Sequence, residues 1–200
     1  SSLASDSEDA VALALKGQIL LDSKDAEKTK LAMSDLAKAV AAQPDNVVIR
    51  YDLGRAYLAS GNMDKAINEF RQAVERRPNY APAQLALAKL YYVKREYANS
   101  IASADRVISI TQARPSPDAI LVKALAQVGV GDIDKAQGLL TQSVAMYPNI
   151  SDLHFELGRI YLAKRQLPQA EASFKKAVEA KRTDFKGITG IQMIQKQLPA

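Results

Sequence analysis

Two columns of small side chains recur along this chain at intervals of 34 or 36 residues. The first column has separations of 34, 36 and 34, and its members are Gly54, Ala88, Ala124 and Gly158. The second has separations of 34, 34, 36 and 34, and its members are Ala32, Ala66, Ser100, Ala136 and Ala170. Close packing between helix backbones needs small residues, so the spacing predicts a stack of similar helix pairs rather than one globular core.

The clearest copy of the pattern runs from Val47 to Asn79. It contains Leu-Gly-x2-Tyr beginning at Leu53, then Ala-x3-Phe-x2-Ala beginning at Ala66, and it closes at Pro78. This pattern resembles the tetratricopeptide-repeat signature, with Arg50 where that family has an aromatic residue. A glycine followed by an asparagine separates the two motifs and predicts the turn between two helices.

The resemblance implies an all-α fold, namely a right-handed superhelical solenoid of about five antiparallel helix pairs followed by a C-terminal helix. We predict a single array over residues 1–200. The predicted pairs span about 5–44, 47–78, 81–112, 117–148 and 151–182, and the terminal helix spans 183–198.

Two irregularities interrupt the period. Gly17 precedes Gly54 by 37 residues while the second column keeps its usual interval, which predicts a longer, charged loop within residues 22–30. Both columns slip by two residues across 112–117, which predicts an insertion between two pairs. This segment contains two prolines, which cannot continue a helix, and it is therefore a candidate kink or hinge.

The composition leaves little room for catalysis. There is no cysteine, so no Cys/His pair or thiolate zinc site can form within the chain, and we find no Ser-His-Asp pattern around the one histidine, His154. Asp132 and Asp134 lack the glycine and glutamate that a calcium loop requires at its later positions. We therefore expect no catalytic residue, no cofactor and no metal, and a chain that is not an enzyme. His154 stands where the family often has Trp, which favours a packing role.

The resemblance also implies a binding surface, because the first helices of successive pairs line a concave groove in this family. It assigns partner-binding roles to Tyr51, Asp52, Arg55, Leu85, Lys89, Tyr92, Leu121, Leu125, Phe155, Glu156 and Arg159. Three basic residues of this set share one column and the aromatic residues add apolar area, which suits a partner with carboxylates and apolar side chains. Simple solvation of the inner helix face is the alternative. The two-Lys, two-Asn, one-Arg clamp of the chaperone-tail-binding members is absent, because Tyr51 and Arg55 replace its first Lys and Asn.

These features indicate a protein–protein interaction scaffold that binds an extended peptide or a partner helix. The run of degenerate repeats is similar to bacterial multi-repeat proteins, some of them involved in envelope or exopolysaccharide assembly. The alternative is a regulatory or substrate-docking segment of a larger enzyme.

Charge is unevenly distributed. Residues 1–46 contain five basic and eight acidic residues, a net charge of −3, and residues 159–200 contain nine basic and three acidic residues, a net charge of +6. The basic end raises the question of nucleic-acid binding. We do not expect it, because the basic residues are spread around the helices and few aromatic residues are placed for stacking.

The termini and the hydropathy bear on location. The chain has no run of 18 apolar residues, so we expect no membrane span. It begins without Met or a signal-peptide pattern, and we expect a mature or excised fragment of a soluble protein from the bacterial cytoplasm or periplasm, its targeting segment removed. The segment 183–198 is more apolar than a terminal cap needs. We therefore expect further repeats after Ala200, with homodimerisation through this segment as an alternative.

Overall fold

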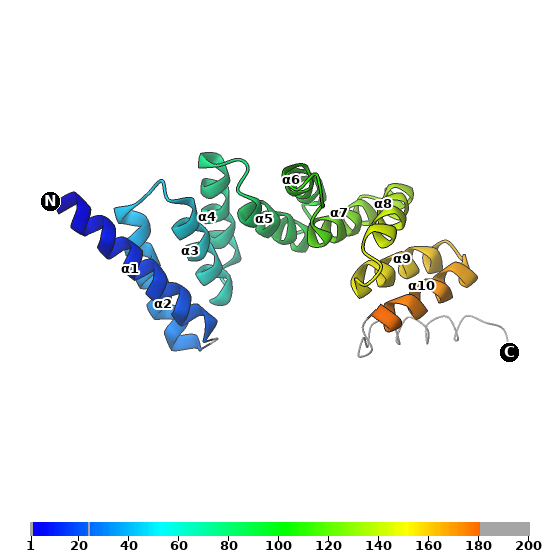
Figure 1. The fold of residues 1–200 in the computed structure, drawn as a ribbon, viewed down its shortest axis with the longest axis horizontal. Coiled ribbons are helices and arrows are strands. Elements are labelled where there is room, and N and C mark those ends of the chain that lie inside the picture. Colours follow the sequence, from blue (N-terminus) through cyan, green and yellow to red (C-terminus); the bar gives the residue numbers. More distant parts are fainter. Residues whose placement is uncertain (1, 24, 181–200) are drawn as a thin grey trace. The chain divides into compact units, whose positions relative to one another are not determined.

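The computed structural model describes residues 2–23 and 25–180. These ranges form ten α-helices and no strand (Figure 1). The helices are α1 (Ser2–Asp22), α2 (Ala26–Ala42), α3 (Val47–Ala59), α4 (Met63–Arg76), α5 (Ala81–Val93), α6 (Tyr97–Ile110), α7 (Pro117–Gly129), α8 (Ile133–Met146), α9 (Ser151–Ala163) and α10 (Leu167–Ala180). The predicted terminal helix at 183–198 lies outside the described residues.

Consecutive helices form pairs, and three residues separate the two helices of every pair. The longer loop expected within residues 22–30 is therefore wrong. The extra residues lengthen α2 instead, which has 17 residues where α4, α6, α8 and α10 have 14. The early start has a local cause, because the Asp25 carboxylate accepts a hydrogen bond from the Lys28 backbone N–H at 2.9 Å and caps α2.

The turns between α3 and α4, α5 and α6, α7 and α8, and α9 and α10 share a residue in the left-handed conformation. Gly61 and Gly131 have φ values of 81° and 89°, and Arg95 and Arg165 have φ values of 61° and 58° at the matching positions of two other pairs. Glycine adopts this conformation without a steric penalty, whereas arginine is strained there. The turn is thus set by the helix-pair geometry and not by the presence of glycine alone.

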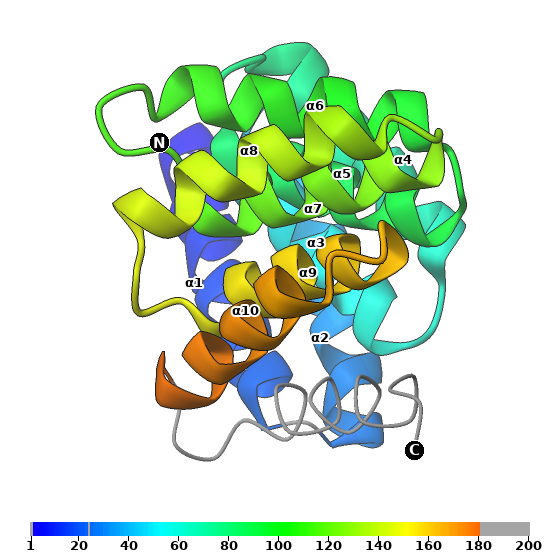
Figure 2. The same cartoon turned by 90° about the vertical axis from the view of Figure 1, so that its right-hand side faces the viewer.

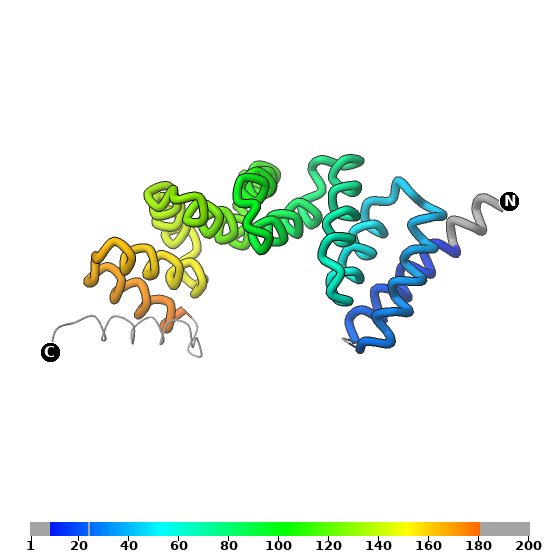
Figure 3. Tube along the Cα trace, turned by 180° about the vertical axis from the view of Figure 1, so that it is seen from behind, coloured from blue at the N-terminus to red at the C-terminus, as the bar shows by residue number. Residues whose placement is uncertain are grey.

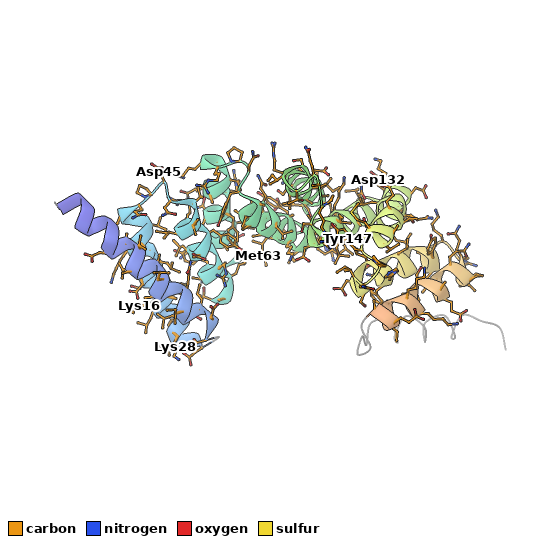
Figure 4. The ribbon with its side chains drawn as sticks, in the orientation of Figure 1. Lys16, Lys28, Asp45, Met63, Asp132 and Tyr147 are labelled. Atoms are coloured by element: carbon orange, nitrogen blue, oxygen red, sulfur yellow. The ribbon has the colours of Figure 1, made fainter. Side chains whose placement is uncertain are left out.

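The linkers between pairs have four residues except before α7, where six residues separate α6 from α7. This confirms the predicted two-residue insertion. The linker is held at several points: the Tyr147 hydroxyl donates to the Pro115 carbonyl, and Ser116 caps α7 by accepting from the Ala119 N–H. Figure 4 shows Tyr147 just after the end of α8. Its contacts tie the linker to the helix pair that follows.

The chain divides into two compact units, an N-terminal unit (Ser1–Leu90) and a C-terminal unit (Tyr91–Ala200). In the N-terminal unit, α1 packs against α2 and α3, and α3 packs against α4, along the antiparallel path traced in Figure 3. Its core includes Leu36 and Leu53, and Phe70 is fully buried.

In the C-terminal unit, α7 packs against α6, α8 and α9, and α9 and α10 lie side by side (Figure 2). One buried cluster is built around Ile120, Leu140 and Leu153, and a second around Phe174. No described helix is long and apolar enough to cross a bilayer.

The small residues of the first column face bulky side chains of the second helix. A Cβ placed on Gly54 would lie 2.5 Å from the Phe70 ring, and one on Gly158 would lie 2.7 Å from the Phe174 ring. A Cβ on Gly17 would lie 2.6 Å from Leu36, which confirms that Gly17 holds the same place in the first pair. These glycines are required because the partner side chain occupies the space that a larger residue would need.

Candidate partner-binding surface

The described part of the C-terminal unit contains a pocket of about 280 Å³. Its walls come from the end of α5, the starts of α6 and α8, and one face each of α7 and α9. The lining residues are Tyr92, Tyr97, Leu125, Val128, Gly129, Ile133, Glu156, Arg159, Ile160 and Ala163. Apolar and aromatic side chains dominate, and one acid and one base stand on the α9 wall.

Two tyrosines form one side of this pocket. The rings of Tyr92 and Tyr97 lie 6.0 Å apart between centroids, with 48° between their planes. Gly129 lies against the second ring, because a Cβ placed on it would be 2.6 Å from Tyr97. A larger residue at 129 would therefore push the ring aside and change the shape of the pocket.

Arg159 and Glu156 supply the charge. The Arg159 Nη1 donates to Glu156 Oε2 at 2.9 Å, and the Arg159 side chain is 56% exposed. A guanidinium has five N–H donors, so one hydrogen bond to Glu156 leaves capacity for a second carboxylate. The pocket thus combines an apolar interior with a cationic rim.

The N-terminal unit has a different arrangement at the matching positions. Arg55 lies 3.3 Å from Asp52 and 3.6 Å from Asp22, so two carboxylates share its guanidinium. Gln18 on α1 donates to the other oxygen of Asp52 at 2.5 Å, which bridges α1 and α3. Asp52 is buried, and its charge adds to the burial that raises the pKa of Tyr80.

The difference has a simple origin in the repeat register. Leu125 occupies the position of Gln18, and Gly129 occupies the position of Asp22. Leucine cannot bridge to Glu156, and glycine provides no second carboxylate for Arg159. In the N-terminal unit, the Gln18 and Asp22 side chains cross the space between the helices to reach Asp52 and Arg55. In the C-terminal unit, Leu125 and Gly129 leave this space open.

Two parts of the chain match family models described as tetratricopeptide repeat, over residues 25–90 and 121–185. Together they span well over half of the chain. The chain is a tetratricopeptide-repeat protein. The predicted family and the all-α repeat fold are confirmed.

Curated relatives share the repeats at low identity. Anaphase-promoting complex subunit 3 of Schizosaccharomyces pombe is 28% identical over 155 residues, which are 78% of this chain and 23% of that protein. Lipopolysaccharide assembly protein B of Escherichia coli strain K12 is 25% identical over 133 residues, 65% of this chain and 34% of that protein. The chain thus spans about a third or less of the length of these relatives.

Solved structures show the same fold. MamA residues 41 to the end from Desulfovibrio magneticus RS-1 superposes with a TM-score of 0.77 at 19% identity, covering 88% of this chain and 97% of that one. YrrB, described as a tetratricopeptide-repeat protein with an unusual peptide-binding site, gives a TM-score of 0.75 at 15% identity and covers 98% and 96%. At these identities the likeness is one of fold.

The repeat structure brings some of the predicted partner-binding residues together. Tyr92, Leu125, Glu156 and Arg159 meet at the pocket of the C-terminal unit. In the N-terminal unit, Tyr51, Asp52 and Arg55 all lie on α3, while Leu85 and Lys89 lie on α5, half-buried and exposed respectively.

Three predicted aromatic or apolar residues pack inside the repeats. The Tyr51 ring lies 5.4 Å from that of Phe70, and the Phe155 ring lies 5.6 Å from that of Phe174. Leu121 is half-buried against the cluster around Ile120. Much of the area of these side chains is therefore used in holding the helix pairs together.

Sequence reasoning missed the pocket residues on the second helices. Tyr97 and Ile133 each begin the second helix of a repeat, and their column is Met63, Tyr97, Ile133 and Leu167. The separations of 34, 36 and 34 were visible in the sequence. The prediction places the groove on the first helices alone, whereas this column lies on the second helices.

His154 has a packing role, as predicted. It is buried, and its Nε2 lies 2.9 Å from the Pro148 carbonyl oxygen. Burial lowers the pKa of His154 below its usual 6.5, and Lys176 lowers it further, while the Pro148 hydrogen bond and Glu179 act in the opposite direction. Within the described residues, no three His, Cys, Asp or Glu side chains are grouped as metal ligands.

Proposed function

We propose that this tetratricopeptide-repeat chain is a protein–protein interaction scaffold without catalytic activity, and that the pocket of the C-terminal unit binds an extended segment of its partner. The observation that carries the proposal is the open space between α7 and α9, where the matching positions in the N-terminal unit are bridged by polar contacts. A half-open apolar pocket with a charged rim is the usual form of a recognition site.

The size and lining of the pocket indicate what it takes. At about 280 Å³ it is at the small end for ligand pockets and suits one bulky apolar or aromatic side chain. Tyr92 and Tyr97 provide rigid apolar area for such a side chain. Arg159, on the rim, can pair with a carboxylate next to it in the partner. The preferred segment therefore has an apolar anchor beside an acidic residue.

The predicted residues of the N-terminal unit remain part of the proposal as a second set of contacts. Asp52 and Asp22 already engage Arg55, so this set contributes less attraction for an acidic partner. Lys89 is exposed on α5 and offers a further cationic contact.

A role in envelope assembly is the setting we propose for this scaffold. The similarity to lipopolysaccharide assembly protein B supports it. The alternative is a docking segment of a larger enzyme. It stays open because the match covers only about a third or less of each relative. Purification of the full-length protein with its partners separates the two, because only the second places a catalytic domain in the same polypeptide.

Peptide display against the 200-residue chain tests the pocket. We expect enriched peptides to share a bulky apolar residue next to Asp or Glu. Arg159→Glu should weaken the enriched peptides about tenfold or more by repelling the carboxylate. Leu125→Gln should weaken them as well, because a glutamine at 125 can bridge to Glu156 as Gln18 bridges to Asp52.

Arg106→Glu is the matched control, because Arg106 is exposed on α6 and does not line the pocket. It makes the same change of charge and should leave the peptide affinities unchanged. Equal binding of the enriched peptides to the wild type and to both pocket variants, measured by fluorescence anisotropy, would show that the pocket is not the binding site.

A further inference from the structure

The pocket of the C-terminal unit opens next to the turns within the helix pairs. Most of its lining residues stand at helix ends beside these turns. Tyr92 and Tyr97 flank the α5–α6 turn, Gly129 and Ile133 flank the α7–α8 turn, and Ala163 ends α9 just before the α9–α10 turn. The side chains of these turns are therefore placed to meet the parts of a bound segment that extend beyond the pocket.

Two of the three turns carry the same basic pair. Residues 94–95 in the α5–α6 turn and 164–165 in the α9–α10 turn are both Lys-Arg, whereas residues 130–131 in the α7–α8 turn are Val-Gly. All four basic residues are exposed. We call the α5–α6 and α9–α10 turns the basic turns. One basic turn adjoins the tyrosine wall of the pocket, and the other adjoins its α9 wall.

The lysines of the basic turns are used within the fold. Lys164 donates to Asp134 and Gln137 at 2.7 and 2.6 Å, and Lys94 lies 3.9 Å from Glu96. The two arginines beside them make no hydrogen bond or ion pair through their guanidiniums to any residue that the structure describes. Both guanidiniums therefore keep their N–H donors for a partner.

The same two arginines stand at a strained backbone position. Arg95 and Arg165 have φ values of 61° and 58°, and Gly61 and Gly131 hold the matching place in two other turns. Arginine lowers the stability of such a turn, whereas glycine does not. Strain of this kind is retained most often at sites that bind or react. Two separate turns thus keep an arginine where glycine fits the backbone better, which indicates a use for the side chain outside the fold.

We propose that Arg95 and Arg165 bind carboxylates on the two sides of the apolar anchor that enters the pocket. The inference rests on the proposed binding function of that pocket and adds the flanking sequence to it. The partner is an acidic protein segment that runs from one basic turn to the other. Its apolar anchor lies between Tyr92 and Arg159, and acidic residues come both before and after the anchor.

The charges around the pocket favour a peptide over a polyphosphate chain. Glu156 stands on the α9 wall, and the Asp132 and Asp134 side chains beside the α7–α8 turn are 44% and 90% exposed. A nucleic acid carries a phosphate at every step and would bring several of them close to these carboxylates. A peptide can place its acidic residues at the two arginines and keep the stretch between them apolar.

The test uses the whole 200-residue chain and four fluorescein-labelled peptides. Every peptide has a central tryptophan followed by aspartate, with glutamates before this pair, after it, on both sides, or replaced by glutamines throughout. Arg95→Gly and Arg165→Gly each remove one guanidinium, and glycine suits the backbone at both positions, so the variants should melt no lower than the wild type. Arg106→Gln is the matched control, because it removes one positive charge from an exposed position on α6 that does not line the pocket.

Fluorescence anisotropy at about 0.1 M salt should show the tightest binding for the peptide with glutamates on both sides. Arg95→Gly should weaken peptides with glutamates on one side of the tryptophan, and Arg165→Gly those with glutamates on the other, by about two- to fivefold each. Neither variant should change the affinity of the glutamine peptide. The differences should vanish at about 1 M salt, where charges are screened beyond about 3 Å. Arg106→Gln should behave as the wild type.

The pocket variants Arg159→Glu and Leu125→Gln separate this inference from the proposed function. If they weaken all four peptides while neither turn variant changes any, the pocket binds as proposed and the role of the arginines is wrong. If the wild type binds no peptide, or the pocket variants change nothing, the proposed function fails and this inference with it.

Two further results would overturn the role of the arginines alone. Equal losses for the glutamate and glutamine peptides in the turn variants would show that the arginines act on the shape of the turns and not on carboxylates. A labelled oligothymidylate that binds more tightly than any peptide, and that both turn variants weaken, would assign the basic turns to nucleic acid.

Discussion

At the scale of single residues, one buried position makes the same hydrogen bond with a different side chain in each of three repeats. Arg50 and Gln84 donate to the carbonyl oxygens of Pro44 and Pro78 at 2.9 and 3.0 Å, and His154 makes the matching contact. Each carbonyl belongs to the residue six positions earlier, in the linker before the helix. The motif predicted an aromatic residue here, so sequence reasoning found the position but not the hydrogen bond that its polar residues share.

The lowered pKa of His154 makes stability depend on pH. The folded state favours neutral imidazole, so the stabilisation is fully present above the unfolded pKa of 6.5 and is lost as the pH falls through the lower folded pKa. His154→Gln should keep a donor for the Pro148 carbonyl, as Gln84 does for Pro78. The free energy of unfolding of the variant should therefore fall less than that of the wild type between about pH 7 and about pH 5.

Urea denaturation followed by circular dichroism at both pH values measures this difference, because the carboxylates common to both proteins cancel. Lys176 and Glu179, whose charges act on His154, are unchanged in the variant. Parallel pH profiles for the two proteins would contradict the prediction.

The contact between Gly54 and Phe70 gives a second residue-scale prediction. Gly54→Ala adds a methyl group 2.5 Å from the ring, at a cost of about 1–3 kcal/mol that a gain of about 1 kcal/mol in helix propensity partly offsets. Phe70→Ala should cost roughly 3–5 kcal/mol through the cavity it leaves. Gly54→Ala with Phe70→Leu should be less destabilised than the sum of its single variants.

The rescue has a natural precedent, because the α7 and α8 pair carries Ala124 and Leu140 at these two positions, both buried. A double-mutant cycle from denaturation midpoints measures the coupling. Additive effects would mean that the methyl group and the ring do not compete for the same space.

At the scale of elements, the helix pairs follow the sequence closely where local signals are strong. The two columns of small residues predicted the helix pairs, and the glycine and asparagine at 61 and 62 predicted the turn between α3 and α4. The start of α2 was missed, because a three-residue excess in the register does not say whether it lengthens a loop or adds a helical turn. Asp25 decides it by capping α2 early.

The left-handed turn residues provide a prediction at this scale. Arg165→Gly should stabilise the protein by a few tenths to about 1 kcal/mol by relieving the strain at φ 58°, and Gly61→Arg should cost about 1 kcal/mol. Gly138→Ala is the control with a different cause, since Gly138 lies inside α8 with open space around it. It should gain about 0.5–1 kcal/mol from helix propensity.

Thermal unfolding by circular dichroism ranks the three variants. If Arg165→Gly and Gly61→Arg shift the midpoint in the same direction, backbone strain is not what distinguishes the two turns.

At the scale of the whole molecule, stability is distributed between units that each have their own core. The N-terminal unit is built on the cluster with Leu36 and Leu53, and the C-terminal unit on the clusters around Leu140 and Phe174. One continuous array over residues 1–200 stays a prediction.

This organisation predicts local responses to core mutations. Phe70→Ala should speed amide hydrogen exchange in the helices of the N-terminal unit much more than in α7 to α10, and Phe174→Ala should do the reverse. Exchange measured by mass spectrometry on both variants tests this. A uniform increase along the chain would indicate that both units unfold as one cooperative body.

The sequence predicted several residues of the candidate site but not the pocket that they line. Four of its residues were predicted from the first helices, but the opening of the pocket depends on Leu125 and Gly129 replacing the polar residues of an earlier repeat. That comparison becomes meaningful only once Gln18 and Asp22 are seen to reach Asp52 and Arg55.

The uniform three-residue joint inside every pair also bears on how such chains change over generations. Duplication or loss of one whole pair leaves every remaining joint with the same length of three residues, so recombination can alter the number of pairs without changing the joints. We expect descendants of a common ancestor to differ in length by whole steps of about 34 residues far more often than by intermediate amounts.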